Sequence, residues 1–188
     1  MIRIRVGALH EADAEAILRP VSSDLAPVTG AARDVELRTG EAVRVRLQAL
    51  GGLPMGGAVV TPGGDVGVPF LIHVVVQSAE EPVSSPGVRR ALLNGLRRAS
   101  EWEMESLALP PLGTGAGNLE PADSARAMLP VLLDHLESHE FPREVTVTVP
   151  NTYEEEVFLR ALEREKEGAS AEPPREPDVR SDDRERNR

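Results

Sequence analysis

The chain has 188 residues, a length that predicts one domain with a short appendage, and 40% of its residues are apolar although only 3% are aromatic. It contains no cysteine, which excludes disulfides, thiolate catalysis and cysteine-based zinc or iron–sulfur centres. A net charge of −10 argues against nonspecific binding to nucleic acid or to an anionic membrane, because both require a basic surface.

The first residues have the pattern of a strand and lack the apolar core of a signal peptide. Apolar and arginine residues alternate over 2–6 with period two. No run in the chain approaches the ~18 apolar residues of a membrane span, so we expect a cytoplasmic location. Residues 16–18 predict a second short strand, and the Arg-rich segment 28–50 predicts one or two helices.

Central strands are predicted by two apolar runs, residues 58–61 and 70–76, because a strand buried on both faces lacks polar alternation. Ser85 and Pro86 then predict a helix start, with serine as the N-cap and proline at the first helical position. A further short apolar run at 106–109 predicts another strand.

The next helix is expected to begin at Pro121 and to contain Pro130 in its interior. A proline inside a helix removes a hydrogen bond and clashes with the preceding turn, at a cost of about 3 kcal/mol. We therefore expect a kink there, or a break near Met128. Residues 145–149 alternate as a strand, and 153–164 predict the last helix.

The C-terminal end differs in composition from the rest of the chain. From Glu165 onward the residues are mostly charged, with prolines and no aromatic side chain. Such a segment buries too little apolar surface to offset its ordering entropy. We expect a domain over residues 1–164 and a disordered, charged tail over 165–188. Alternating strands and helices predict an α/β fold, a three-layer α/β/α sandwich.

Three glycines, Gly113, Gly115 and Gly117, lie between the strand at 106–109 and the helix at Pro121. Glycines let the backbone approach an anion, and the N-terminus of the following helix adds the positive end of its dipole. The spacing matches neither the dinucleotide-binding motif GxGxxG nor a Walker loop. From the residues alone, a phosphate-binding loop and a purely structural turn both remain open.

These glycines belong to a longer motif, Pro111-Leu112-Gly113-Thr114-Gly115-Ala116-Gly117. It resembles the second phosphate loop of macro domains, the modules that bind ADP-ribose. Residues 53–64 and 70–75 are similar to the central strand pair of that family, and the resemblance covers about residues 1–163. It implies a mixed central sheet whose first and last strands run antiparallel to the others.

The resemblance implies that the chain binds ADP-ribose or a related nucleoside-diphosphate sugar, free or attached to a protein. Backbone N–H groups and the helix dipole supply the positive field, so it implies no metal and no cofactor. The positions that it places against the ligand are Gly113, Thr114, Gly115, Ala116, Gly117, Ser22, Gly30 and Asn151.

The N-terminal half departs from the family pattern. Ala8 stands where family members have an aspartate that reads the adenine amino group, and Ser22 replaces an asparagine that contacts the distal ribose. The first phosphate loop is reduced to residues 27–30. The acidic and histidine positions of hydrolytic members have no clear match, although Asp34 and Glu36 are candidates. Because hydrolysis needs a held ribose, a positioned water and a base, we favour a binding module with no assigned catalytic residue.

Two alternatives stay open. An ADP-ribosyl hydrolase or O-acetyl-ADP-ribose deacetylase would require Ser22, Asp34 or Glu36 to have taken over catalysis. A degenerate interaction scaffold without a ligand would explain the altered N-terminal half most simply.

Asn151 has two interpretations. In the family this strand end borders the adenine site, whereas the residues themselves favour a helix N-cap. That cap is Asn151, or Thr152 in a capping box with Glu155.

The histidines favour structural roles. His135 and His139 have the i,i+4 spacing of helical metal ligands, but no third ligand is near in sequence, and both sit where they complement a helix C-terminus. His73, inside an apolar strand, is expected to be a hydrogen-bonded core residue.

Overall fold

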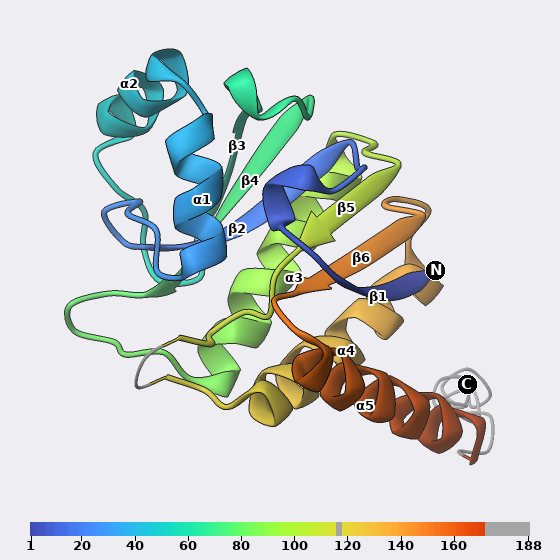
Figure 1. Cartoon of the computed structure of the whole chain (residues 1–188). Helices are drawn as coiled ribbons and strands as arrows, with labels where there is room; N and C mark the ends of the chain where they lie inside the picture. The colour runs from blue at the N-terminus through green and yellow to red at the C-terminus, as the bar shows by residue number, and fades with distance from the viewer. Residues whose placement is uncertain (116–117, 172–188) are drawn as a thin grey trace, which may run out of the picture.

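The computed structural model describes residues 1–115 and 118–171 of the chain. These residues form a six-stranded sheet with helices on both faces, as Figure 1 shows. None of the helices within these residues combines the length and hydropathy that a bilayer span requires. The elements in chain order are β1 (Ile2–Val6), η1 (Leu9–Glu11), β2 (Ala16–Ser22), α1 (Gly30–Arg38), α2 (Glu41–Leu50), β3 (Ala58–Pro62), η2 (Gly64–Val66), β4 (Phe70–Gln77), α3 (Ser85–Glu101), β5 (Ser106–Leu109), α4 (Pro121–Ser138), β6 (Glu144–Val149) and α5 (Thr152–Ala171).

The sheet has the strand order β1-β6-β5-β2-β4-β3, and its neighbours are parallel except for β3 and β4. The connection between β3 and β4 is short, and parallel neighbours need a crossover of about a dozen residues or more, so this pair is antiparallel. The expectation that the first and last strands run antiparallel is wrong. Residues 7–15 return the chain from the carboxyl end of β1 to the amino end of β2, so both strands point the same way.

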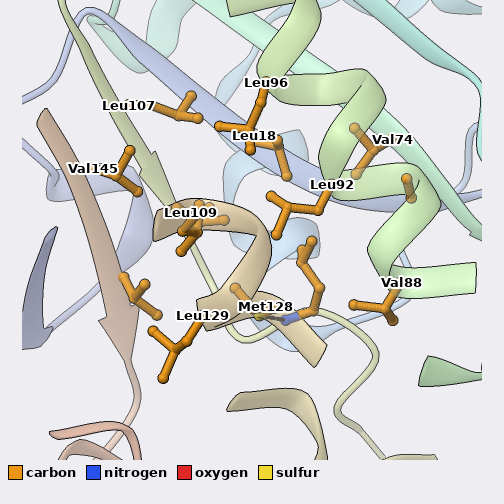
Figure 2. Close-up of a cluster of buried hydrophobic side chains, with 14 of the residues drawn as sticks. Leu18, Val74, Val88, Leu92, Leu96, Leu107, Leu109, Met128, Leu129 and Val145 are labelled. Carbon is orange, nitrogen blue, oxygen red and sulfur yellow. Dashed lines mark hydrogen bonds between the residues drawn. The ribbon is translucent and has the colours of Figure 1, made fainter. Parts of the chain in front are cut away.

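Helices α3, α4 and α5 cover one face of the sheet, and α1 and α2 lie over the other (Figure 1). Successive strand residues point to opposite faces, so Leu18 joins the core beneath α3 whereas Ile17 joins the core beneath α1. Figure 2 shows the larger core, to which α3 contributes Leu92 and Leu96. Each such fully buried leucine stabilises the fold by about 1.5–3 kcal/mol. The three-layer α/β/α sandwich is confirmed.

Strand β2 is longer than the predicted residues 16–18 and continues past Arg19 and Pro20. Pairing of β2 with β5 ends at Ile17↔Ala108, whereas pairing with β4 continues. Pro20 therefore lies where β2 has lost one neighbour, and its missing N–H removes no bond to β5. The burial of Arg19 depends on partners that are distant in sequence.

The residues 28–50 form two helices, α1 and α2, within the range of the prediction. Helix α3 begins one residue earlier than predicted. Its N-cap is Ser84, whose Oγ accepts a hydrogen bond from the Gly87 N–H at 3.2 Å. Pro86 lies in the first turn, where its missing N–H has no helical partner to lose.

Helix α4 is unbroken, so the break predicted near Met128 is wrong. Pro130 is exposed to solvent. Met128, Leu129 and Leu132 are fully buried in the core between α4 and the sheet. Tertiary packing of this apolar face keeps the helix continuous across the proline, since packing supplies most helical stability in proteins.

Helix α5 ends at Ala171, beyond the predicted end near Arg164. Leu162 still belongs to the core, and the residues 165–167, Glu-Lys-Glu, are good helix formers that extend the helix by local propensity. The expected charged tail therefore begins inside a helix, and its remainder, residues 172–188, lies outside the described residues.

Candidate ligand-binding site

The candidate site is a cavity of about 440 Å³ at the carboxyl ends of β1, β5 and β6. Ligands of open α/β sheets bind at this edge, and cavities of this size hold small molecules. Its two facing walls are the start of α1 and the loop after β5. The lining consists of Gly7, Ala8, Leu9, Thr29, Gly30, Ala31, Asp34, Pro110, Pro111, Thr114, Gly115, Thr148, Pro150 and Glu154.

The first wall is the N-terminal turn of α1. Thr29 is the N-cap, and its Oγ1 accepts a hydrogen bond from the Ala32 N–H at 3.1 Å. The other N–H groups of a first turn have no partner within their helix, and the helix dipole makes this end attractive to anions. Gly30 and Ala31 line the cavity, so this positive end of α1 faces it.

The second wall is the glycine loop after β5. Gly115 has φ +130°, and a Cβ added to it would lie 3.6 Å from the Val28 carbonyl oxygen. The two walls are therefore in van der Waals reach of each other. Thr114 also lines the cavity, and its hydroxyl donates to the Pro111 carbonyl at 3.1 Å. A hydroxyl already bonded in this way is available to a ligand mainly as an acceptor.

Gly113 shapes the loop from beneath and lies outside the cavity lining. Its φ is +78°, and a Cβ there would meet Val88 Cγ2 of α3 at 2.7 Å. From α4, the Ser124 hydroxyl donates to the Leu112 carbonyl at 2.8 Å. Packing against α3 and α4 thus fixes the first part of the loop, at Leu112 and Gly113.

The other predicted positions are placed less directly. Ser22 lies outside the lining, with its hydroxyl 2.5 Å from Asp24 Oδ1 and 3.1 Å from the Ala26 carbonyl in the turn after β2. Asn151 also lies outside the lining. It caps α5, its Oδ1 accepting from the Glu154 N–H at 2.9 Å, so its N-cap interpretation is confirmed. Ala116 and Gly117 lie outside the described residues.

Comparison with known proteins identifies the family. A family model described as Macro domain matches residues 20–128. The chain belongs to the macro domain family. It is 32% identical over 133 residues to an uncharacterized protein of Aeropyrum pernix, covering 67% of each chain. It is also 26% identical over 173 residues to a macro domain-containing protein of Caldanaerobacter subterraneus, covering 86% of this chain and 95% of the relative.

Solved structures share the fold of this macro domain. The Oceanobacillus iheyensis macrodomain with ADP has a TM-score of 0.79 at 17% identity, over 88% of this chain and 91% of that chain. The Trypanosoma brucei macrodomain in complex with ADP-ribose has a TM-score of 0.77 at 15% identity, over 86% and 68% of the two chains. At these identities the likeness shows the fold alone.

Among the described residues, the cavity lining of this macro domain contains two carboxylates and neither lysine nor arginine. Asp34 comes from the second turn of α1, and Glu154 from the first turn of α5. Burial raises the pKa of Glu154, and a hydrogen bond with Asn151 opposes that rise in part. The positive field that the lining offers an anion therefore comes from backbone N–H groups and the α1 dipole.

Sequence reasoning missed Thr148 and Glu154. The available signal for Thr148 was its place at the carboxyl end of the alternating strand 145–149, on the face opposite Val147 and Val149. Glu154 has no such signal, because an acidic residue in the first turn of a helix is common for dipole reasons alone.

An ion pair between a buried arginine and a half-buried glutamate ties α1 to the sheet. Arg19 of β2 is fully buried. Its Nη1 donates to Glu36 Oε2 at 2.9 Å and to the Ala32 carbonyl at 3.3 Å, both in α1. Glu36 is thus engaged in the fold, and among the three hydrolase candidates Ser22, Asp34 and Glu36 the cavity lining includes Asp34 alone.

The histidines have structural partners. Arg19 Nε donates to His73 Nδ1 at 2.7 Å, and His73 Nε2 lies 2.8 Å from Thr61 Oγ1, so the expected core role of His73 is confirmed. His135 Nε2 lies 3.0 Å from the Phe141 carbonyl, and its ring stacks on His139. Residues 1–115 and 118–171 contain no group of three or more His, Asp or Glu side chains placed to hold a metal ion.

Proposed function

We propose that this macro domain binds ADP-ribose, or a closely related nucleoside-diphosphate sugar, in the cavity at the carboxyl ends of β1, β5 and β6. The observation that supports this proposal best is the close approach of two backbone segments. Gly115 lies within contact distance of Val28, two residues before α1. A diphosphate in the cavity beside this contact faces the positive end of a helix and the N–H groups of a glycine loop. Similar folds solved with ADP and with ADP-ribose support this ligand class.

The residues have unequal parts in this proposal. Gly30, Thr114 and Gly115 contact the ligand, and Ala116 and Gly117, which the motif also predicts as contacts, lie outside the described residues. Gly113 acts by packing the loop onto α3. Ser22 and Asn151 support neighbouring backbone without lining the cavity. The expected partners are free ADP-ribose and ADP-ribosylated proteins of the cytoplasm.

The test is calorimetric titration with ADP-ribose, using Gly115→Glu. We expect micromolar binding by the native chain and a loss of roughly a hundredfold or more in the variant. The new carboxylate lies where the diphosphate binds, and like charges in contact cost several kcal/mol. The matched control is Gly51→Glu at the C-cap of α2, another glycine with positive φ, where an added Cβ meets nothing within 4 Å.

Each result decides between functions. Equal affinities for the native chain and Gly115→Glu would place the ligand away from the glycine loop. If the native chain does not bind and ADP-ribose leaves its melting temperature unchanged, the chain is a ligand-free scaffold.

A second candidate function is hydrolysis of an ADP-ribosyl bond or an O-acetyl ester, favoured by the position of Asp34. No hydrogen bond or ion pair with the described residues engages its carboxylate, so it is available to position a water. The assay is release of ADP-ribose from a mono-ADP-ribosylated protein. A hydrolase loses release in Asp34→Asn while keeping its affinity for ADP-ribose, and Ser22→Ala keeps both. If the native chain releases nothing, it is a binding module.

A further inference from the structure

The cavity wall that α1 forms is connected to the sheet by a short, irregular segment. Between β2 and α1 the chain makes an isolated bridge, Val21↔Pro27, and α1 itself has no place in the strand ladder. Val35 packs α1 onto the sheet, but apolar contacts are non-directional, so they leave the exact position of the helix open. Directed contacts are needed to hold the N-terminus of α1 beside the glycine loop.

Arg19 makes such contacts with α1 and with the turn before it. The residue lies on β2 and is fully buried. Its Nη1 donates to Glu36 Oε2 at 2.9 Å and, more weakly, to the Ala32 carbonyl at 3.3 Å, so it contacts two successive turns of α1. Its Nη2 donates weakly to the Leu25 carbonyl at 3.4 Å. Because a guanidinium is planar and its N–H groups have fixed directions, one rigid group positions both the turn and the helix.

The sheet holds this guanidinium from the other side. Arg19 and His73 are partners in the pairing of β2 with β4, and Arg19 Nε donates to His73 Nδ1 at 2.7 Å. His73 Nε2 in turn lies 2.8 Å from Thr61 Oγ1 on β3. A continuous set of hydrogen bonds therefore runs from β3 through β4 and β2 to α1.

An ion pair with a buried arginine is a weak source of stability. The Arg19 side chain has no exposed surface, and the Glu36 side chain is 30% exposed. Charges lose their hydration on burial, so replacing such a pair by apolar side chains of similar volume is often neutral or stabilising. What a charged, hydrogen-bonded pair adds to packing is a defined geometry.

We propose that Arg19 and Glu36 are positioning residues for the ligand, because they hold the first turn of α1 where its N–H groups meet the diphosphate. Neither residue lines the cavity, so both act through α1. The two walls are close enough for a small shift to matter, since a Cβ on Gly115 would lie 3.6 Å from the Val28 carbonyl oxygen. This inference rests on the proposed function, because it requires an anion at that turn.

The test replaces the ion pair by apolar side chains in the double variant Arg19→Met/Glu36→Leu. Its melting temperature should stay within about 5 °C of the native value, because apolar packing replaces the pair. Its affinity for ADP-ribose, titrated well below the melting temperature, should fall by about tenfold. That is the worth of one hydrogen bond between a helix N–H and a charged phosphate. A pair with a merely structural role would change the melting temperature and leave the affinity of the folded chain unchanged.

Glu36→Gln is a milder variant that keeps the shape of the side chain. Glu36 is partly exposed, so water solvates the new amide and folding is preserved. The amide oxygen still accepts a hydrogen bond from Arg19 but carries no charge, so we expect a loss of about threefold in affinity. The matched control is Val43→Ala, in the same apolar core but on α2. It should lower the melting temperature and bind ADP-ribose like the native chain.

The outcomes separate this inference from the proposed function. If Glu36→Gln and the double variant bind ADP-ribose like the native chain, and Gly115→Glu does not bind, the positioning role is refuted and the function stands. If Val43→Ala loses affinity along with melting temperature, affinity follows overall stability, and the positioning role is refuted as well. If the double variant does not fold, the affinity of Glu36→Gln alone decides. If the native chain does not bind ADP-ribose, both proposals fall.

Discussion

At the scale of single residues, the interior of the sheet fixes the protonation state of a histidine. Arg19 Nε–H donates to His73 Nδ1, so the ring proton of neutral His73 is on Nε2, facing Thr61 Oγ1. Burial holds the pKa of His73 well below its usual range, and the charge of Arg19 lowers it further. The folded protein therefore keeps His73 neutral at pH values where an exposed histidine is protonated.

This difference predicts a loss of stability in acid. Below about pH 6.5 the unfolded chain binds a proton at His73 and the folded chain does not, so stability falls until the pH reaches the lowered folded pKa. Between pH 7.5 and 5.0 the free energy of unfolding should fall more in the native chain than in His73→Gln, by at most roughly 2 kcal/mol, the limit set by the unfolded histidine. Urea denaturation at several pH values measures it. Parallel profiles of unfolding free energy against pH for the two chains would contradict the prediction. The lowered pKa of His135 affects both chains alike, so the difference between them reports on His73.

At the scale of elements, α4 remains continuous at the expense of one backbone hydrogen bond. Pro130 cannot donate to the carbonyl four residues earlier, and it is exposed, so its ring contributes little to the core. We predict that Pro130→Ala raises the free energy of unfolding by about 1–2 kcal/mol. This is less than the full cost of a helical proline, because alanine also gives the unfolded chain more freedom.

Thermal unfolding measures this effect, as an increase of a few degrees in melting temperature for a domain of this size. The control is Glu137→Ala, an exposed position of the same helix, where we expect a change within about 0.5 kcal/mol. A lower melting temperature for Pro130→Ala would mean that the proline itself is needed for the geometry of α4.

The sequence predicted elements that depend on local pattern. Helix α3, with its small and apolar residues at helical spacing, and the apolar strands β3 and β4 all formed as expected. The direction of β1 was not predictable, because it depends on Val145 and its neighbours at the other end of the chain. Strand β2 was underestimated because Glu36 and His73, which satisfy Arg19, are remote in sequence.

The candidate site likewise contains some residues that local sequence motifs predict and others that they do not. Gly30, Thr114 and Gly115 were predicted from motifs and line the cavity. Thr148 and Glu154 were not, because neither belongs to a motif. They become neighbours of the glycine loop only when β6 inserts beside β5 and α5 begins at the same edge of the sheet.

At the scale of the whole molecule, the packed part of the chain extends into α5, where Phe158 and Leu162 are buried. We predict that a chain ending after Ala171 melts within about 1 °C of the full chain and binds ADP-ribose equally. A chain ending after Val157 loses both buried side chains, each worth about 2–5 kcal/mol. Their sum is comparable with the whole stability of a small domain, so we expect this chain to melt at a much lower temperature.

Circular dichroism melting curves of the three chains make the comparison. A fall of several degrees after removal of residues 172–188 would show that these residues stabilise the domain, and would contradict a domain that ends with α5.

The pairing of β1 with β6 also has a consequence for synthesis. Ile2 pairs with Val145, so β1 leaves the ribosome before its neighbour β6 and waits while the intervening residues are translated, roughly 7–30 s at ordinary elongation rates. During this time β1 is an unpaired strand edge, the kind of surface that chaperones protect. Gly7 and Glu154 line the same cavity from the two ends of the chain, so a nucleotide cannot assist the nascent polypeptide and stabilises only the completed one.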